Sequence, residues 1–167
     1  RMRWWGMNEW RPDRLERRLP HLQMRARIQA AMRQWFVSEG FVEVETPILQ
    51  AAPGAEVHLT GFATEWELPD GEEHERWLHS SPEFAMKKLL AGGMPKIFQF
   101  ARVFRNAEGS ALHHPEFTML EWYRAGTGYE SIMADCKALL TSTGVEELCW
   151  AGHVCDPLAE PERLTVA

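Results

Sequence analysis

Residues 104–124 decide the fold of this chain, and they read FRNAEGSALHHPEFTMLEWYR. Residues 97–104 and 117–123 are rich in β-branched and aromatic types, which is typical of strands. The stretch between them, 106–115, contains glycine, serine and proline and is typical of a loop. The pattern therefore predicts a β-hairpin. Because side chains alternate along a strand, one face of the second strand carries Phe117, Met119, Glu121 and Tyr123, and the other carries Thr118, Leu120, Trp122 and Arg124.

The first of these faces carries a carboxylate where a half-buried strand would be apolar. Burying the carboxylate of Glu121 is costly unless it is paired or hydrogen-bonded. From the hairpin alone, Glu121 could pair with an internal Lys or Arg, or it could bind the ammonium group of a ligand. Phe117 could pack in the core or stack on a base. Together with Arg105 and His113, which can hold phosphate, the face indicates ATP plus an amino acid as ligands.

Helical and strand patterns alternate along the rest of the chain. Apolar spacing and glycine stops predict helices over 21–39, from Ser81–Pro82 to residue 91, and over 129–143. Strands are predicted up to Pro47 and over 57–63 and 77–79, with a charged, solvated loop at 68–76. The predicted fold class is α+β, an antiparallel β-sheet with flanking helices.

The composition bounds the class of protein. The chain has 167 residues, 45% of them hydrophobic, and a formal net charge of -6. Nucleic-acid-binding domains usually present a basic face, so tRNA is the less favoured partner. There is no signal peptide and no long apolar run, and the three cysteines form no CxxC pair. We therefore expect a cytoplasmic protein with reduced thiols, no metal site and no membrane contact.

Three segments resemble class II lysyl-tRNA synthetases. Residues 104–106, His113 and the run PEFTMLEWY at 115–123 resemble motif 2 of that family. Residues 40–49 (GFVEVETPIL) resemble motif 1, and residues 81–89 (SPEFAMKKL) resemble its Ser/Ala-Pro-Glu helix start. The triplet at 122–124, WYR, is closer to the tRNA-independent paralogues of this family, the elongation factor P–lysine lysyltransferases. The resemblance covers roughly residues 10–144 and implies a class II catalytic-domain fold.

The resemblance implies an ATP site on the hairpin. Arg105 would hold the α-phosphate, His113 would lie near the outer phosphates, and Phe117 would stack on the adenine. The family usually carries Glu two residues after this arginine, where the chain has Ala107. Glu108, the next residue, would take that role in a shifted loop. Mg²⁺ would accompany the nucleotide and bridge its outer phosphates.

The resemblance also implies a lysine site and a reaction. Glu83 would bind the α-amino group, and Glu121 with Tyr123 would bind the side-chain ammonium. The implied enzyme is a ligase that activates lysine with ATP and transfers it to a lysine of elongation factor P, as a homodimer formed through motif 1. Two alternatives stay open: a piece of a lysyl-tRNA synthetase that charges tRNA, or a non-catalytic paralogue that binds a nucleotide or a partner. The choice between α-lysine and β-lysine also stays open.

The expected organisation has three segments. Residues 1–20 form a leader or arm, 21–144 a partial class II catalytic domain with motifs 1 and 2, and 145–167 an irregular segment. Nothing after residue 144 resembles motif 3, and no anticodon-binding barrel precedes motif 1, so we expect a fragment or a truncated gene. An antiparallel sheet cut before motif 3 would have an open edge. Open edges favour association, so we expect a marginally stable or oligomeric chain.

Overall fold

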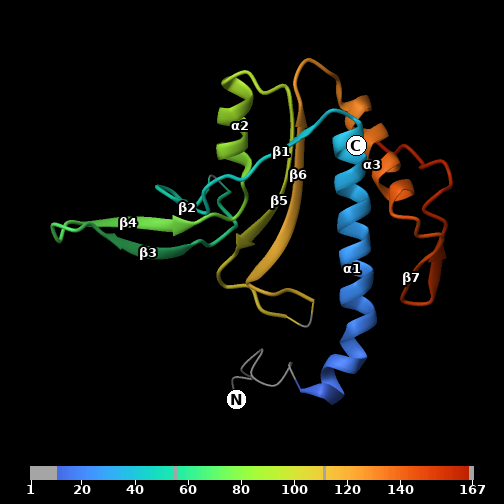
Figure 1. Ribbon diagram of the computed structural model, residues 1–167, viewed down its shortest axis with the longest axis horizontal. Helices are drawn as coiled ribbons and strands as arrows, with labels where there is room; N and C mark the ends of the chain where they lie inside the picture. The colour runs from blue at the N-terminus through green and yellow to red at the C-terminus, as the bar shows by residue number, and fades with distance from the viewer. Residues whose placement is uncertain (1–10, 55, 111, 166–167) are drawn as a thin grey trace. The chain divides into compact units, whose positions relative to one another are not determined.

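The structure contains the hairpin predicted from the sequence. A computed structural model describes residues 11–54, 56–110 and 112–165 (Figure 1). The described chain divides into two compact units: one is Gly40–Thr127, and the other combines the residues up to Glu39 with those from Gly128 onward. These boundaries differ from the predicted limits at 21 and 144. The division into a catalytic domain and flanking segments itself stays a prediction.

The sheet of the first unit contains the predicted hairpin. Strand β5 (Lys96–Phe104) pairs antiparallel with β6 (Glu116–Arg124), and the short β1 (Val42–Glu43) pairs parallel with β5 on its other side. In the part of the chain that the structure describes, β6 is thus an edge strand. The α+β class is confirmed.

Strand β5 contributes buried apolar side chains to both faces of the sheet. Ile97 and Val103 on one face and Phe98 on the other are fully buried. Helix α2 (Glu83–Ala91) covers one end of the Ile97 face through Met86, which is also fully buried. The same cluster includes Val44, Leu89, Leu90, Met94 and Tyr123. This packing holds the start of α2 against the hairpin strands.

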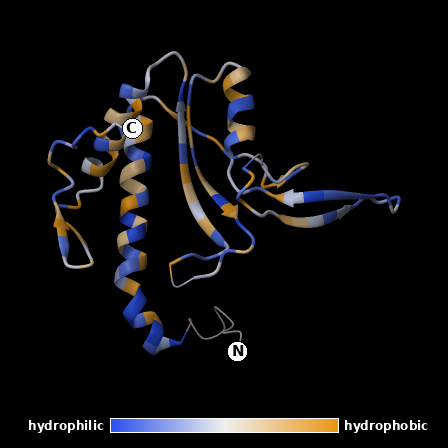
Figure 2. Cartoon of the chain, turned by 180° about the vertical axis from the view of Figure 1, so that it is seen from behind, coloured by the Kyte–Doolittle hydropathy of each residue, from blue (hydrophilic) through white to orange (hydrophobic). Residues whose placement is uncertain are grey.

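A second sheet corrects the predicted strand positions. It consists of β2 (Leu49–Gln50), β4 (Glu73–Leu78) and β3 (Phe62–Glu67), in that order. The predicted strands at 57–63 and 77–79 and the predicted loop at 68–76 were therefore wrong in their limits, because both strands run into the charged stretch. Beyond the two residues that pair with β2, strands β3 and β4 form a two-stranded ribbon. Such a ribbon leaves both faces accessible to water, so charged residues do not exclude strand structure there. Figure 2 shows the hydrophilic character of β4.

Helix α1 of the other unit begins earlier than predicted. It spans Pro12–Ser38, with a proline at its start and Pro20 inside it, rather than beginning at His21. Residues 13–19 are mostly Arg, Leu and Glu, which are strong helix formers. Leu15, Leu19 and Leu22 also recur at helical spacing, a signal that the prediction did not use. The predicted leader is thus helical from residue 12, and its first ten residues lie outside the described chain. Gly40, with φ 79°, follows the helix as predicted.

The rest of this unit contains a second helix and a small hairpin. Helix α3 (Tyr129–Ser142) matches the prediction and contacts α1. The segment expected to be irregular instead forms β7 (Leu148–Trp150) and β8 (His153–Cys155), paired antiparallel. Its cysteines are exposed and free, in agreement with the prediction of ordinary thiols. No helix in the described residues is both long and apolar enough to cross a bilayer.

Candidate ligand-binding face of the β5–β6 hairpin

One end of the hairpin face presents a cation beside an aromatic ring. Arg105 directly follows β5, and its backbone N–H donates to the carbonyl of Pro115 at 2.9 Å. Its guanidinium carbon lies 5.1 Å from the ring centre of Phe117, within the range of a cation–π contact. Its Nε is buried and has no hydrogen-bond partner among the described residues. A buried donor without a partner is costly, and an anionic ligand oxygen would satisfy it.

The other end of the face presents a carboxylate held by two hydroxyls. The Ser81 hydroxyl donates to Glu121 Oε1 at 2.5 Å, and the Tyr123 hydroxyl donates to Oε2 at 3.0 Å. No Lys or Arg in the described residues pairs with Glu121, so the predicted alternative of an internal ion pair is not what the structure has. The negative charge of Glu121 is therefore available to a cationic ligand.

Tyr123 is kept neutral by its surroundings. Burial, and then the neighbouring charge of Glu121 and the hydrogen bond to it, raise the pKa of the Tyr123 hydroxyl well above its usual range. The carboxylate of Glu83 acts in the same direction. Tyr123 therefore remains a hydrogen-bond donor to a higher pH than an ordinary tyrosine, and both carboxylates lie close enough to influence the same phenol.

The raised pKa of Tyr123 predicts a loss of stability at alkaline pH. A proton held more tightly in the folded state stabilises fully below the unfolded pKa of 10.0, and this contribution declines as the pH rises further. We expect urea midpoints measured at about pH 9 and about pH 11 to fall with pH in the unmodified chain. Compared with the unmodified chain, the fall in midpoint should be smaller in Tyr123→Phe. It should be the same in Tyr129→Phe, which removes an exposed tyrosine. Equal drops in all three proteins would contradict the assignment.

Glu83 lies in the first turn of α2, close to Glu121 through Ser81. The Ser81 hydroxyl that donates to Glu121 also accepts the backbone N–H of Glu83 at 3.0 Å, so it joins the carboxylate of the strand to the first residue of α2. The N-cap of the helix is Pro82 and not the predicted Ser81. Glu83 forms an ion pair with Lys87 at 2.5 Å, with both side chains partly exposed. It also lines a cavity of about 30 Å³, enough for one ammonium group or water, together with residues that include Gln50, Gly54, Glu56, His79 and Ser80.

The two ends lie on the same face of the hairpin. Phe117 and Glu121 are four residues apart on β6, so their side chains point to the same side. At the usual rise per residue their Cα atoms are about 13 Å apart. The face thus separates a cationic and aromatic end from an anionic end by this distance.

The loop residues predicted for the ATP site are not joined to this face. Glu108 and His113 lie between β5 and β6, and no hydrogen bond or ion pair links either one to Arg105 or Phe117 in the described part of the chain. The exposed His113 has its Nδ1 2.8 Å from the Ser110 hydroxyl. Ala107 adopts a left-handed conformation with φ 59°, so the loop turns sharply just before Glu108. Their predicted roles stay predictions.

Sequence reasoning missed three polar residues around the site. Ser81 was predicted only as a helix cap, and its bond to Glu121 depends on a packing contact that no local pattern reveals. Gln99 lies directly opposite Glu121, is buried, and accepts a hydrogen bond from Thr46 at 3.0 Å. A lone amide among Ile97, Ala101 and Val103, which share its face of the strand, was a usable signal for it. The third is His79, buried just after β4.

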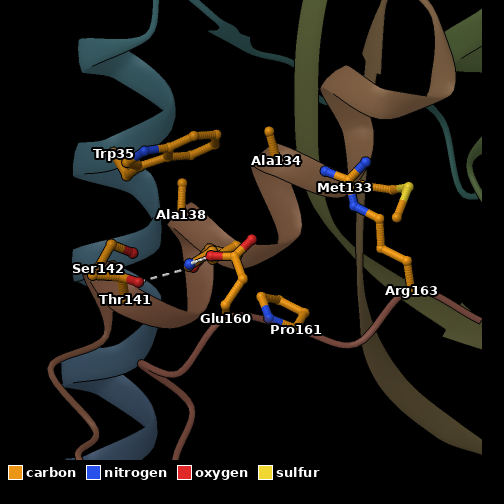
Figure 3. A pocket seen from close by; sticks show the side chains of 10 residues that line it. Trp35, Met133, Ala134, Ala138, Thr141, Ser142, Glu160, Pro161 and Arg163 are labelled. Carbon is orange, nitrogen blue, oxygen red and sulfur yellow. Dashed lines mark hydrogen bonds and ion pairs between the residues drawn. The ribbon is translucent and has the colours of Figure 1, made fainter.

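The described chain adds no metal-ligand group to the hairpin face, and its large cavity brings no further residues there. Across residues 11–54, 56–110 and 112–165, the structure has no group of three or more His, Cys, Asp or Glu side chains placed to hold a metal ion. A cavity of about 510 Å³ lies within the other unit (Figure 3). It contains none of the predicted site residues. The Lys137–Glu160 ion pair at its rim lowers the pKa of Glu160 and ties residue 160 to α3.

Comparison with known proteins assigns the family. A family model described as tRNA synthetases class II (D, K and N) matches residues 10–150. The chain belongs to this family. The predicted resemblance is therefore confirmed at the level of the family, and the match includes the whole of the hairpin and α2.

Several relatives within this class II family carry the same name, elongation factor P–(R)-β-lysine ligase. The protein from Haemophilus influenzae (strain PittGG) is 47% identical over 120 residues, which cover 71% of this chain and 36% of the relative. The protein from Mannheimia succiniciproducens is 52% identical over 101 residues, covering 60% and 31%. The protein from Histophilus somni (strain 2336) is 41% identical over 140 residues, covering 83% and 42%. The chain thus spans at most about two fifths of the length of these relatives.

Proposed function

We propose that residues 40–127 form the substrate-binding face of a ligase that activates a lysine-type amino acid with ATP and transfers it to a lysine of elongation factor P. The names of the relatives support (R)-β-lysine as the amino acid and elongation factor P as the acceptor. The observation that carries the proposal is the single hairpin face with Arg105 and Phe117 at one end and Glu121 at the other.

At the cationic end, Arg105 would hold the α-phosphate of ATP. Its partnerless buried Nε offers a donor, and its planar guanidinium can bind two phosphate oxygens at once. The guanidinium lies against Phe117, so stacking of the adenine on that ring would require Arg105 to turn toward the phosphate. His113 and Glu108 would approach the nucleotide from the loop.

At the anionic end, Glu121 would bind the side-chain ammonium of the amino acid. The carboxylate is already oriented by the Ser81 and Tyr123 hydroxyls, so little conformational freedom is lost on binding. Glu83 would bind the second amino group beside the small cavity that it lines. The separation of about 13 Å along β6 lets the carboxylate of the amino acid point toward the α-phosphate while its ammonium contacts Glu121.

In the first chemical step, the carboxylate of the amino acid attacks the α-phosphorus. An oxygen–phosphorus bond forms, the bond to the β-phosphate oxygen breaks, and pyrophosphate leaves. The carboxylate is ionised near neutral pH, so no general base is needed. Arg105 would stabilise the charge that develops on the α-phosphate oxygens, and the hairpin would align the two substrates. No step is assigned to Mg²⁺, which would be held mainly by the phosphates of ATP.

In the second step, the neutral amine of the acceptor lysine attacks the acyl carbon of the adenylate. An amide bond forms, the bond to the AMP oxygen breaks, and the amine loses its extra proton to solvent. A homodimer formed through the motif 1 segment 40–49, a cytoplasmic location and Mg²⁺ bound to the phosphates of ATP are further parts of this proposal.

The proposal is tested by ligand binding and by transfer. Calorimetry with the chain should detect binding of a non-hydrolysable sulfamoyl analogue of β-lysyl-adenylate, and ATP–pyrophosphate exchange should depend on (R)-β-lysine. Transfer of labelled β-lysine to elongation factor P, and not to tRNA, would complete the assignment. Transfer to tRNA would favour a lysyl-tRNA synthetase. Binding of nucleotide without exchange would favour a non-catalytic paralogue, and no binding of the analogue would refute the proposal.

A further inference from the structure

His79 connects the two sheets of the unit that carries the hairpin face. It follows β4 directly and is 2% exposed. Its backbone N–H donates to the carbonyl of Ile48 at 3.0 Å, and its own carbonyl accepts the N–H of Phe104 at 3.0 Å. Phe104 is the last residue of β5, and Arg105 comes next. One buried residue therefore bonds both to the second sheet and to the strand end that carries the arginine.

The imidazole ring adds a second bond to the same strand. Its Nε2 lies 2.7 Å from the carbonyl oxygen of Arg102, which can only accept, so Nε2 carries the proton and donates. The other nitrogen, Nδ1, is buried and has no hydrogen-bond partner in the described chain. The ring thus donates one hydrogen bond, and its acceptor, the carbonyl of Arg102, lies two residues before Phe104.

His79 is also directly connected to the anionic end of the site. The next residue, Ser80, donates from its hydroxyl to the carbonyl of Pro53 at 3.1 Å. Ser81 then donates to Glu121, and Glu83 begins α2. The segment 79–83 therefore runs from the strand end beside Arg105 to the carboxylates that we assign to the amino acid.

We propose that His79 is a positioning residue that fixes the separation between the nucleotide end and the amino-acid end of the site. This inference rests on the proposed function. A ligand that bridges both ends needs them at one fixed spacing, whereas ATP or lysine alone needs only its own end. Loss of the Nε2 bond should therefore weaken a bridging ligand more than either separate substrate, an effect that a general loss of stability would not produce.

Two amide variants distinguish the effect of the Nε2 hydrogen bond from the effect of the side-chain volume. His79→Asn keeps a nitrogen near the Nδ1 position but cannot reach the Arg102 carbonyl, whereas His79→Gln places an N–H donor near the Nε2 position. We expect His79→Asn to lower the affinity for the sulfamoyl analogue of β-lysyl-adenylate about tenfold, since it removes the part-buried bond that ties the end of β5 to residue 79. The affinities for ATP alone and for β-lysine alone should change less than about threefold, and His79→Gln should restore the analogue.

Amide hydrogen exchange without ligand provides an independent readout. The Phe104 amide should exchange faster in His79→Asn and return toward the original rate in His79→Gln, while the Ala101 amide stays unchanged. Three results would overturn the inference: an unchanged exchange rate of the Phe104 amide in His79→Asn, equal losses of affinity for the analogue, ATP and β-lysine, or an analogue affinity of His79→Gln no higher than that of His79→Asn. If His79→Asn does not fold, His79→Gln becomes the test. A folded His79→Gln that binds the analogue at least about tenfold more weakly than the unmodified chain would also overturn the inference. If the unmodified chain binds none of the ligands, the proposed function fails, and the exchange data still decide the role of His79.

Discussion

Replacing Arg105 by alanine is expected to lower the affinity for ATP about a hundredfold, because a bidentate, charge-assisted contact to phosphate is lost. The buried Nε of this residue has no partner among the described residues, so little native structure should be disturbed. Calorimetric titration with ATP measures the effect directly, and thermal unfolding checks that the variant is folded. The ATP affinity of Arg105→Lys should lie between those of the unmodified chain and Arg105→Ala, since lysine keeps the charge but not the planar pair of donors.

Arg102 supplies a matched control for this prediction. It lies on β5, three residues before Arg105, and its side chain points to the opposite face. Its one ion pair among the described residues is an exposed contact with Glu116 at 3.9 Å. Exposed pairs of this kind contribute little, so Arg102→Ala should bind ATP with nearly unchanged affinity. Equal losses in both variants would indicate that general positive charge, and not a contact on the hairpin face, attracts the nucleotide.

The sequence predicted the fold best where local pattern and packing agree. The hairpin and α3 follow from apolar spacing and from turn residues at their ends, and the structure places them as expected. The start of α1 was missed although Leu15, Leu19 and Leu22 recur at helical spacing, because the prolines at 12 and 20 suggested an irregular leader. The limits of β3 and β4 were missed because charged residues were taken as loop, although cross-strand pairing satisfies the backbone there.

The strand residues of the candidate site could be predicted from the sequence, but the residues that hold them in place could not. Alternation along one strand is enough to place Phe117, Glu121 and Tyr123 on one face. Ser81 and His79 act across sequence separations that no periodicity encodes: Ser81 bonds to a residue 40 positions away, and the His79 ring to one 23 positions away. Such contacts depend on how sheets and helices pack, which only the three-dimensional structure provides.

Replacing Glu121 by glutamine is expected to lower the affinity for the amino acid about tenfold to a hundredfold, because a charged partner of the ligand ammonium becomes neutral. ATP affinity should change by less than about twofold, since the nucleotide end lies about 13 Å away along the strand. Titration of the chain separately with β-lysine and with ATP measures both quantities. Equal losses for the two ligands would contradict the assignment of Glu121 to the amino-acid end.

The same variant should not reduce the stability of the chain. Glu121 is half-buried and has hydroxyl partners but no cation in the described structure, so its charge is costly in the absence of ligand. The isosteric amide removes that charge and retains hydrogen bonding with Ser81 and Tyr123. We therefore expect Glu121→Gln to unfold at the same or a higher temperature while binding the amino acid worse, as is common where a site is kept polar for its ligand. Glu116→Gln, an exposed change on the opposite face of β6, should alter neither property.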